Sequence, residues 1–435
     1  MKSYPKYKPS GVDFLGGIPE SWDLHKLKLL TNHISIPAFK KEDDEIYIAL
    51  ENIESWTGKI IHSEEFSGFD STARKFTEND ILFGKLRPYL AKVVIPDFKG
   101  VCVSEIIVLR PIKLKRKYLF FILLNPNFID FVSQTAEGTK MPRTSWNKIC
   151  DLKFPVPPLS EQQQIADFLD YKTEECDRFI ANRQKQIELL NEQKASIINK
   201  AVTKGINPNV KMKPSGVNWI EEIPENWIFT KLKFLTNQIV DGTHFTPEYL
   251  DDGIPFLRVT DIKGSCFDLS NIKKISYKEH KELSKRCKPE KGDLLLSKNG
   301  TIGRTIIVDW DYEFSIFVSL CLIKFKKDFL AKFANYVFKS NLFDQQINDN
   351  AKAVTIQNLH LEKIKEFEIV FPPLSEQQQI IDFLDYKMEQ CDHVISKYQK
   401  QIDLMQEYRT ALISQAVTGK IDVREWKPKA SSHPK

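Results

Sequence analysis

The strongest constraint on the fold of this chain is an internal duplication. Residues 8–32 recur 205 positions later as residues 213–237, with 15 of 25 positions identical. Residues 158–203 recur 215 positions later as residues 373–418, with 28 of 46 positions identical. The segment between these matches is ten residues longer in the second copy, and there the copies barely resemble each other. A repeated frame around two divergent inserts therefore predicts a pseudo-two-fold protein.

The second repeated block has the signals of a long helix. A proline pair precedes it, Ser160 and Gln163 are predicted to form a capping box, and Gly205 or Gly419 ends it. Apolar residues recur in steps of four and three, which is typical of a coiled-coil seam, and the simplest partner for either helix is its copy. The predicted seam residues are Leu169, Cys176, Ile180, Ile187, Leu190, Ile197, Leu384, Cys391, Ile395, Ile402, Met405 and Leu412. A globular helix that buries this stripe in its own domain is the alternative.

The divergent inserts have mixed α and β patterns. In the first, strands are expected at 46–53, 80–83, 91–96 and 101–109, and a helix at 116–134 that is interrupted at Pro126. In the second, strands are expected at 256–262, 293–297, 304–308 and 315–325, and a helix at 329–348. The fold class is thus α+β, with two globular domains (1–158 and 204–373), two long helices (159–203 and 374–420) and a C-terminal tail (421–435).

Composition excludes several classes of protein. With 435 residues, 42% of them hydrophobic, the chain is neither a small disulfide scaffold nor a disordered tail. Its longest apolar stretches, 118–124 and 316–323, are far shorter than the ~20 residues of a membrane span, and its basic start has no signal-peptide core. Seven scattered cysteines without a Cys-x-x-Cys pair suggest free thiols. A soluble, cytoplasmic protein is expected.

Motifs of catalysis and metal binding are weak in this sequence. It has no glycine-rich nucleotide loop, no Gly-x-Ser-x-Gly and no His-Glu-x-x-His. Residues 125–128 (Asn-Pro-Asn-Phe) faintly resemble a signature of amino-methyltransferases, but within an apolar helical stretch they favour a helix kink. Residues 241–244 (Asp-Gly-Thr-His) could suggest a metal pair, although a turn with a polar contact is the simpler interpretation.

Polar, basic loops are the best candidates for binding. One loop in each insert follows a predicted strand, and a second precedes each long helix, at 137–143 and 350–357. Such side chains donate to base edges and to phosphates, and their matching positions in both copies favour contact with DNA over solvated surface charge. The candidate residues are Lys85, Arg87, Tyr89, Thr139, Lys140, Arg143, Lys298, Asn299, Thr301, Arg304 and Lys352. The basic runs 110–117 and 273–291 either position phosphates or are solvated faces.

These motifs together resemble the specificity (S) subunit of Type I restriction-modification systems. The resemblance rests on Pro-Leu-Ser-Glu-Gln-Gln-Gln at 158 and 373 and on Ile-Pro-Glu-x-Trp at 18 and 223. It also rests on Asp-Ile-Leu-Phe-Gly-Lys-Leu-Arg-Pro-Tyr at 80–89, and on Asp-Gly-Thr-His with Gly-Ile-Pro-Phe-Leu-Arg within 241–258. The likeness spans essentially the whole chain.

The resemblance implies a division of labour. Each insert would be a target recognition domain that reads one half of a split double-stranded DNA sequence, and the helices would form an intramolecular antiparallel coiled coil that spaces the halves. Two methyltransferase (M) subunits would dock on the helices, and restriction (R) subunits would join them. The subunit would have no active site and no cofactor of its own, since S-adenosylmethionine, ATP and Mg²⁺ would belong to the partner chains.

Simple physics agrees with these expectations. A helix of about 43 residues is roughly 65 Å long at ~1.5 Å per residue, so a rigid pair would impose a fixed gap between half-sites. Because the inserts differ, the two halves should differ too. A stand-alone DNA-binding or scaffold protein with a coiled-coil core is the main alternative, and an enzyme that acts alone is a third.

Overall fold

The fold was derived from a computed structural model, which describes residues 2–12, 15–43, 45–61, 73–217, 220–264, 266–351 and 359–428. It divides into two compact units. The first unit contains Met1–Gln184 and Gln399–Lys435, and the second contains Lys185–Tyr398. The expected division followed the order of the chain, whereas each compact unit combines one α+β domain with parts of both long helices.

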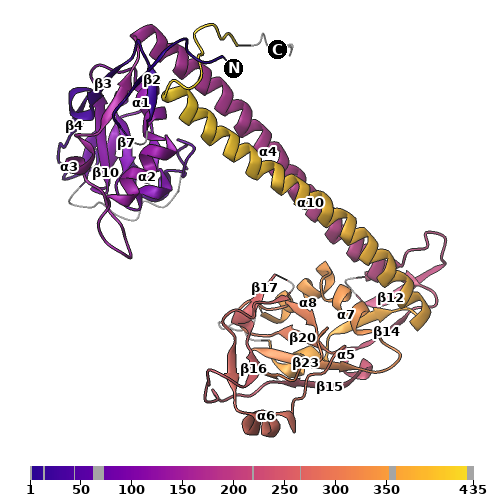
Figure 1. Cartoon of the computed structure of the whole chain (residues 1–435). Helices are drawn as coiled ribbons and strands as arrows, with labels where there is room; N and C mark the ends of the chain where they lie inside the picture. Colours follow the sequence, from indigo (N-terminus) through magenta and orange to yellow (C-terminus); the bar gives the residue numbers. More distant parts are fainter. Residues whose placement is uncertain are drawn as a thin grey trace. The chain divides into compact units, whose positions relative to one another are not determined.

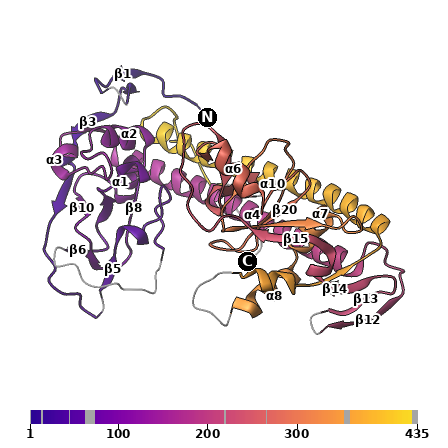
Figure 2. The same cartoon turned by 90° about the horizontal axis from the view of Figure 1, so that it is seen from below.

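In the first unit, a four-stranded antiparallel sheet forms the centre of the α+β domain. Its order is β4-β10-β7-β8, and the smaller sheet β5-β9-β6 lies in the same domain. Helix α1 packs against β7 and β8, and Figure 2 labels α1 and β8 in this domain. The elements are β1 (Tyr7–Pro9), β2 (Gly17–Pro19), β3 (Asp23–Lys26), β4 (Thr31–Ile34), β5 (Ile46–Ile48), β6 (Arg74–Phe76), β7 (Ile81–Gly84), β8 (Val93–Val94), β9 (Gly100–Cys102), β10 (Ile106–Pro111), α1 (Arg116–Leu123), α2 (Pro126–Gln134), α3 (Trp146–Ile149) and β11 (Lys153–Val156).

The second unit repeats this architecture around the sheet β15-β23-β20-β21, three strands of which are labelled in Figure 1. Its elements are β12 (Met212–Val217), β13 (Ile220–Pro224), β14 (Ile228–Lys231), α5 (Leu232–Leu235), β15 (Thr236–Asp241), β16 (Ile254–Leu257), β17 (Ile262–Lys263), β18 (Cys266–Phe267), β19 (Lys273–Ile275), α6 (Tyr277–Ser284), β20 (Leu294–Ser297), β21 (Thr305–Ile307), β22 (Ser315–Ile316), β23 (Leu320–Phe325), α7 (Ala331–Val337), α8 (Asn341–Ala351), α9 (Leu361–Lys365) and β24 (Glu368–Phe371).

The duplication extends to the divergent inserts. β5 pairs with β9 in parallel, as β16 does with β22, and β3 pairs with β11 as β14 does with β24. The central strands β7 and β20 are fully buried, which explains their continuous apolar sequences. The two inserts therefore share one fold although their sequences barely match.

Several predicted elements are divided in the structure. The strand expected at 101–109 is two strands, because Ile106 N donates to Val103 O in a turn that moves the chain from one sheet to the other. A turn at Phe317 likewise divides the strand expected at 315–325. The helix expected at 329–348 is divided at Ser340 into α7 and α8, and the strand expected at 46–53 ends at Ile48. The interruption at Pro126 is confirmed, with Asn125 as the N-cap of α2.

The two long helices are α4 (Leu159–Lys204) and α10 (Leu374–Val417), each unbroken (Figure 1). In the first unit, Leu169 near the start of α4 shares a core with Leu412 near the end of α10. In the second unit, Ala201 near the end of α4 shares a core with Leu384 near the start of α10. The helices are therefore antiparallel in each unit. Every predicted seam residue is buried or half-buried, as residues of a helix-helix contact would be.

The predicted capping box at the start of α4 is wrong. Gln162 N donates to Pro158 O, so the helix begins at Leu159 and already includes Ser160. Gln163 Nε2 donates forward to Asp167 Oδ1 (2.9 Å) instead of reaching back. The predicted helix ends agree better, since Gly205 and Gly419 adopt φ values of +74° and +72° just beyond the helices, a conformation that glycine adopts without strain.

The repeated motifs of the frame contact each other. Buried Glu161 accepts hydrogen bonds from Trp22 Nε1 (3.1 Å) and from the Tyr4 hydroxyl. In the second copy, Glu376 accepts a hydrogen bond from Trp227 Nε1 (3.0 Å). The tryptophan of each Ile-Pro-Glu-x-Trp turn is thus bound to the first turn of the following long helix.

The glutamine that follows each of these glutamates also connects the long helix to its domain. Gln162 Nε2 donates to Pro157 O (2.9 Å), and its Oε1 accepts from Lys115 N (2.8 Å), at the N-cap of α1. Gln377 makes the same pair of contacts, with Pro372 O (3.0 Å) and Leu330 N (2.8 Å). The duplicated sequence therefore encodes the junction between each domain and its long helix.

We expect Glu161→Ala to destabilise the first unit by about 2 to 3 kcal/mol, because Trp22 Nε1 and the Tyr4 hydroxyl would stay buried without their acceptor. Urea unfolding measures the change. Glu174→Ala, on the exposed side of the same helix, is the matched control and should unfold like the wild type. Equal midpoints for both variants would contradict the structural role of Glu161.

The cysteines and the length of the apolar helices can be compared with the structure. All seven cysteines are free thiols in the structure. Among the helices of the described ranges, none is long and apolar enough to cross a membrane.

Candidate nucleic-acid interface

The fold of the first unit brings together its two predicted binding loops. The loop after β7 and the loop at 137–143 are joined by hydrogen bonds from Arg87 N to Pro142 O (2.7 Å) and from Thr144 N to Lys85 O (2.9 Å). Leu86 and Arg143 form an isolated β-bridge. Two groups of three predicted residues, at least 50 positions apart in sequence, therefore form one surface: Lys85, Arg87 and Tyr89 with Thr139, Lys140 and Arg143.

The side chains of this surface are mostly accessible. Tyr89, Thr139, Lys140 and Arg143 are exposed, and Lys85 and Arg87 are half-buried. Arg87 has a φ of +50°, in the left-handed region that a non-glycine residue rarely adopts. Strained backbone of this kind is common where a side chain must be held in one direction for function.

The electrostatic environment of this surface suits an anion. The ring of His33 stacks on Trp146, with centroids 5.1 Å apart. Burial lowers the pKa of His33, and the positive charges of Lys85 and Arg74 lower it further. Only one of the predicted cations is neutralised by a carboxylate in the described part of this surface, through the 2.9 Å ion pair of Arg143 Nε with Glu105.

In the second unit, the corresponding loop follows β20 and is closed by Ser297. Its hydroxyl donates to Thr301 O (2.6 Å) and accepts from Arg304 N (2.9 Å). Thr301 and Arg304 are exposed, whereas Asn299 is half-buried and its Oδ1 has no hydrogen-bond partner among the described residues. The side chains of Thr301 and Arg304 are therefore accessible to a ligand.

Lys298 does not have the predicted accessibility. Its side chain is only 5% exposed, and Nζ lies 3.0 Å from Asp241 Oδ2. The sequence pattern could not separate this lysine from its neighbours, because the ion pair is formed across 57 positions of the chain. We therefore correct its predicted accessibility: Lys298 holds the base of the loop through its ion pair with Asp241.

Asp241 is the centre of a cluster that the sequence did not reveal. Its buried carboxylate also contacts Arg286 and His244 Nε2, the latter at 3.0 Å. Burial raises the pKa of Asp241, but Lys298, Arg286 and His244 lower it more, so that the net pKa lies below its ordinary value. The Asp-Gly-Thr-His motif is therefore a turn with ion pairs, as its simpler interpretation predicted. No group of three or more potential metal ligands occurs within the described ranges.

Two predicted features remain to be placed. Lys352 and most of the loop at 350–357 lie outside the described residues. In the basic runs, Arg110 forms a bidentate pair with buried Asp80 (2.8 and 2.9 Å), and Lys274 and Lys291 pair with acidic neighbours. This pairing favours structural or solvated faces over phosphate contacts for those residues.

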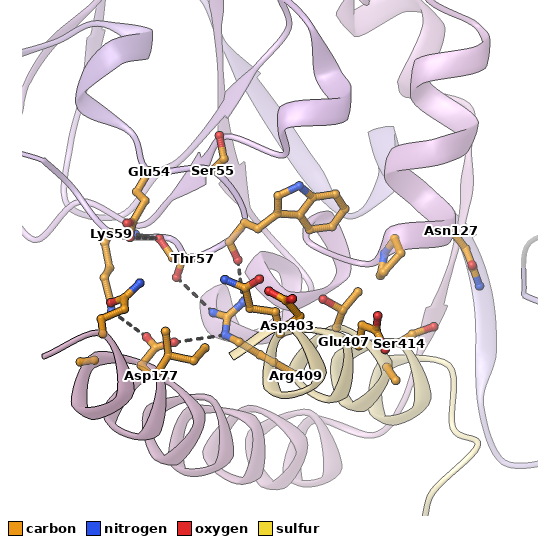
Figure 3. Close-up of a pocket in the computed structure, with 18 residues that line it drawn as sticks. Glu54, Ser55, Thr57, Lys59, Asn127, Asp177, Asp403, Glu407, Arg409 and Ser414 are labelled. Atoms are coloured by element: carbon orange, nitrogen blue, oxygen red, sulfur yellow. Dashed lines mark hydrogen bonds and ion pairs between the residues drawn. The ribbon is translucent and has the colours of Figure 1, made fainter. Parts of the chain in front are cut away.

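A cavity of about 960 Å³ in the first unit lies between the loop at 54–59 and the two long helices (Figure 3). Buried Arg409 points from α10 to this loop and donates to Trp56 O (2.7 Å), while Lys59 pairs with Asp177 of α4 (2.8 Å). The cavity has four carboxylates in its lining, Glu54, Asp177, Asp403 and Glu407, against these two cations. Its charge is unsuited to DNA phosphates, so the polar loops remain the better interface.

The family profile and the similar proteins that match this chain all point to the same family. The sequence profile described as Type I restriction modification DNA specificity domain matches residues 19–189 and 224–404. The MjaX specificity subunit of Methanocaldococcus jannaschii is 26% identical over 94% of this chain and 96% of its own length. The type I restriction enzyme EcoBI specificity subunit of Escherichia coli is 24% identical over 71% of this chain and 66% of its own length.

A solved structure shares the fold. The matching chain comes from work described as the structural basis underlying complex assembly and conformational transition of the type I R-M system. It aligns with a TM-score of 0.70 and 18% identity, over 93% of this chain and 99% of the other. The duplicated arrangement of domains and helices is thus found in an experimental structure.

Proposed function

This chain belongs to the Type I restriction-modification DNA specificity family and is a DNA sequence-recognition subunit, and we propose that its two α+β domains each read one half of a bipartite target. The observation that carries the proposal is the matching position of the loops after β7 and β20, on two domains of the same topology. One shared scaffold presents two different sets of polar side chains.

The target of such a protein is asymmetric. Lys85, Arg87 and Tyr89 occupy the loop of the first recognition domain, whereas Asn299, Thr301 and Arg304 occupy that of the second. Because side chains of different hydrogen-bonding pattern select different base edges, the two half-sequences should differ even though the domains are related by duplication.

The long helices set the gap between the half-sequences in this proposal. α4 and α10 contain 46 and 44 residues without a break, which corresponds to roughly 65 to 70 Å at ~1.5 Å per residue. Their buried seam and the junctions at Glu161 and Glu376 give a stiff connection. A stiff connection imposes one spacing, whereas a flexible linker would allow several.

The same proposal assigns the chemistry to other chains. The subunit is non-catalytic and assembles with two methyltransferase subunits, which supply adenine methylation with S-adenosylmethionine, and restriction subunits add ATP- and Mg²⁺-dependent cleavage. The alternative of a stand-alone DNA-binding or scaffold protein is not favoured by relatives named specificity subunits. Affinity capture of the tagged chain from its host tests the assembly, since a scaffold would return no DNA methyltransferase.

Arg304→Ala tests which domain reads which half. We expect it to weaken discrimination at one half-sequence by about 1 to 3 kcal/mol, and to leave the other half unchanged. Sequencing of methylated sites in cells that carry the variant measures this effect. Lys140→Ala should act on the opposite half, and Lys263→Ala, an exposed and ion-paired lysine of the second domain, should change neither. Equal loss at both halves would show that Arg304 contacts phosphates only.

A further inference from the structure

The second recognition domain has a cationic turn that the predicted loops do not include. The cluster around Asp241 holds Arg286 and His244 on its exposed side, and Lys298 on its buried side. Lys298 and Arg286 together carry one positive charge more than Asp241, before any protonation of His244. Glu282 lies beside them, but it pairs with Lys285. The cluster as a whole therefore has a surplus of one positive charge.

This turn is joined to the loop after β20. His244 Nε2 and Lys298 Nζ both lie 3.0 Å from the same oxygen of Asp241, so the turn and the base of the loop meet at one atom. Duplex DNA is an extended ligand. If Thr301 and Arg304 hold it, the same duplex can also contact the turn. The charge surplus of the turn is of the sign that DNA requires.

The turn borders a cavity of about 300 Å³ whose shape is set by the backbone. It is lined by Thr243, His244, Phe245 and Arg286 among others. A Cβ at Gly242 would lie 2.0 Å from Ile316 O, so that only glycine allows this close approach of the turn to the strand end. The side chains beside Gly242 are thus presented by a rigid backbone.

An aromatic side chain faces water at the rim of this cavity. Phe245 is 58% exposed, although a phenylalanine gains free energy from burial. In the first recognition domain, Phe39 occupies the corresponding place after β4 and is 83% exposed. Both domains therefore present an exposed phenylalanine after the same edge strand, in a region where their sequences otherwise diverge.

We propose that Arg286 and His244 bind the phosphate backbone of duplex DNA and that Phe245 packs against the adjacent sugar and base edge, as a second contact of the second recognition domain. This inference rests on the proposed function, because it assumes that the domain binds DNA. Phe39 makes the equivalent apolar contact in the first domain. Asp241 holds this contact and the loop after β20 in a fixed relation to each other.

The test measures binding of the full chain, assembled with its methyltransferase, to duplex DNA. The duplex carries the sequence that is found methylated in the genome of the host. Binding is followed by fluorescence anisotropy at several salt concentrations. Arg286→Gln should weaken binding about tenfold and reduce the slope of log K against log salt by about 0.9, the value for one lost phosphate contact. Phe245→Ser should weaken binding by about tenfold without a change in slope, since it removes no charge.

Two matched variants serve as controls. Lys291→Gln removes an exposed, ion-paired cation of the same domain, and Leu269→Ser removes an exposed apolar side chain. Both should bind like the wild type. If Phe245→Ser and Arg286→Gln also bind like the wild type while Arg304→Ala binds more weakly, the inference is wrong and the proposed function stands. If the unaltered complex does not prefer its target to a scrambled duplex, the proposed function itself fails. Phe245→Ser decides the matter should Arg286→Gln unfold, because an exposed side chain contributes little to stability.

Discussion

Asp241→Ala is expected to destabilise the second recognition domain by about 3 to 5 kcal/mol, because it would leave the ammonium group of Lys298 buried without a counter-charge. Hydrogen exchange of β20 and β23 measures the effect on this domain alone. Asp311→Ala, which breaks the exposed pair with Lys291, should cost no more than about 1 kcal/mol.

A double variant separates the buried charge from other effects. Asp241→Ala combined with Lys298→Met removes both partners and should recover much of the lost protection, because no unpaired charge stays in the interior. Protection as low in the double variant as in the single one would show that Asp241 acts mainly through Arg286 and His244.

The same ion pairs predict a dependence on pH. The pKa of Asp241 is lower in the folded chain than its ordinary value of 3.8. Its carboxylate therefore stabilises the domain at neutral pH, and this contribution is lost as the pH falls below about 4 and through the lowered pKa. Asp241→Asn should lack this part of the acid sensitivity.

Matched insertions in the long helices are expected to change the target of the protein. Four residues added after Gln184 in α4 and four added after Tyr398 in α10 lengthen both helices by ~6 Å, nearly two base-pair rises of ~3.4 Å. Four residues are close to one helical turn, so the seam stays almost in phase. Methylated sites in cells with this variant should contain the same two half-sequences, with one or two more unspecified base pairs between them.

The control for this experiment is an insertion in α4 alone. It shifts one helix against the other, and since each unit contains parts of both helices, it should abolish methylation or strongly reduce it. Retained activity with unchanged spacing in the matched variant would show that the helices do not position the domains. New half-sequences would show that recognition is not confined to the inserts.

The frame of this protein could be predicted because its signals are local. The seam residues repeat at helical spacing within one segment, and Gly205 and Gly419 mark the helix ends through their own backbone preference. Because of the duplication, each of these signals occurs twice in the sequence. The long helices, the α+β inserts and the likeness to specificity subunits could therefore all be inferred from the sequence.

The boundaries of short elements could not be predicted as well. Residues 101–109 have the apolar pattern of one strand, but the turn at Val103 sends its two halves to different sheets. Ser160 and Gln163 have the spacing of a capping box, which would start the helix at Glu161, yet the helix begins two residues earlier, at Leu159. At Val103 the two halves pair with strands elsewhere in the chain, which a pattern of spacing does not contain. At Ser160 the competing contacts are local, since Gln162 N bonds to Pro158 O and the Gln163 side chain bonds forward to Asp167.

For the candidate site, the sequence by itself determined which loops are polar and that they occupy matching positions in both copies. Only the tertiary structure decided which of their side chains are free to bind. It joined the loops of Arg87 and Pro142 into one surface, and it buried Lys298 against Asp241 while it left Arg304 exposed. The physical reason is that the sequence around a charged residue does not identify its partner. Whether a lysine faces water or a carboxylate depends on segments that meet only when the chain folds.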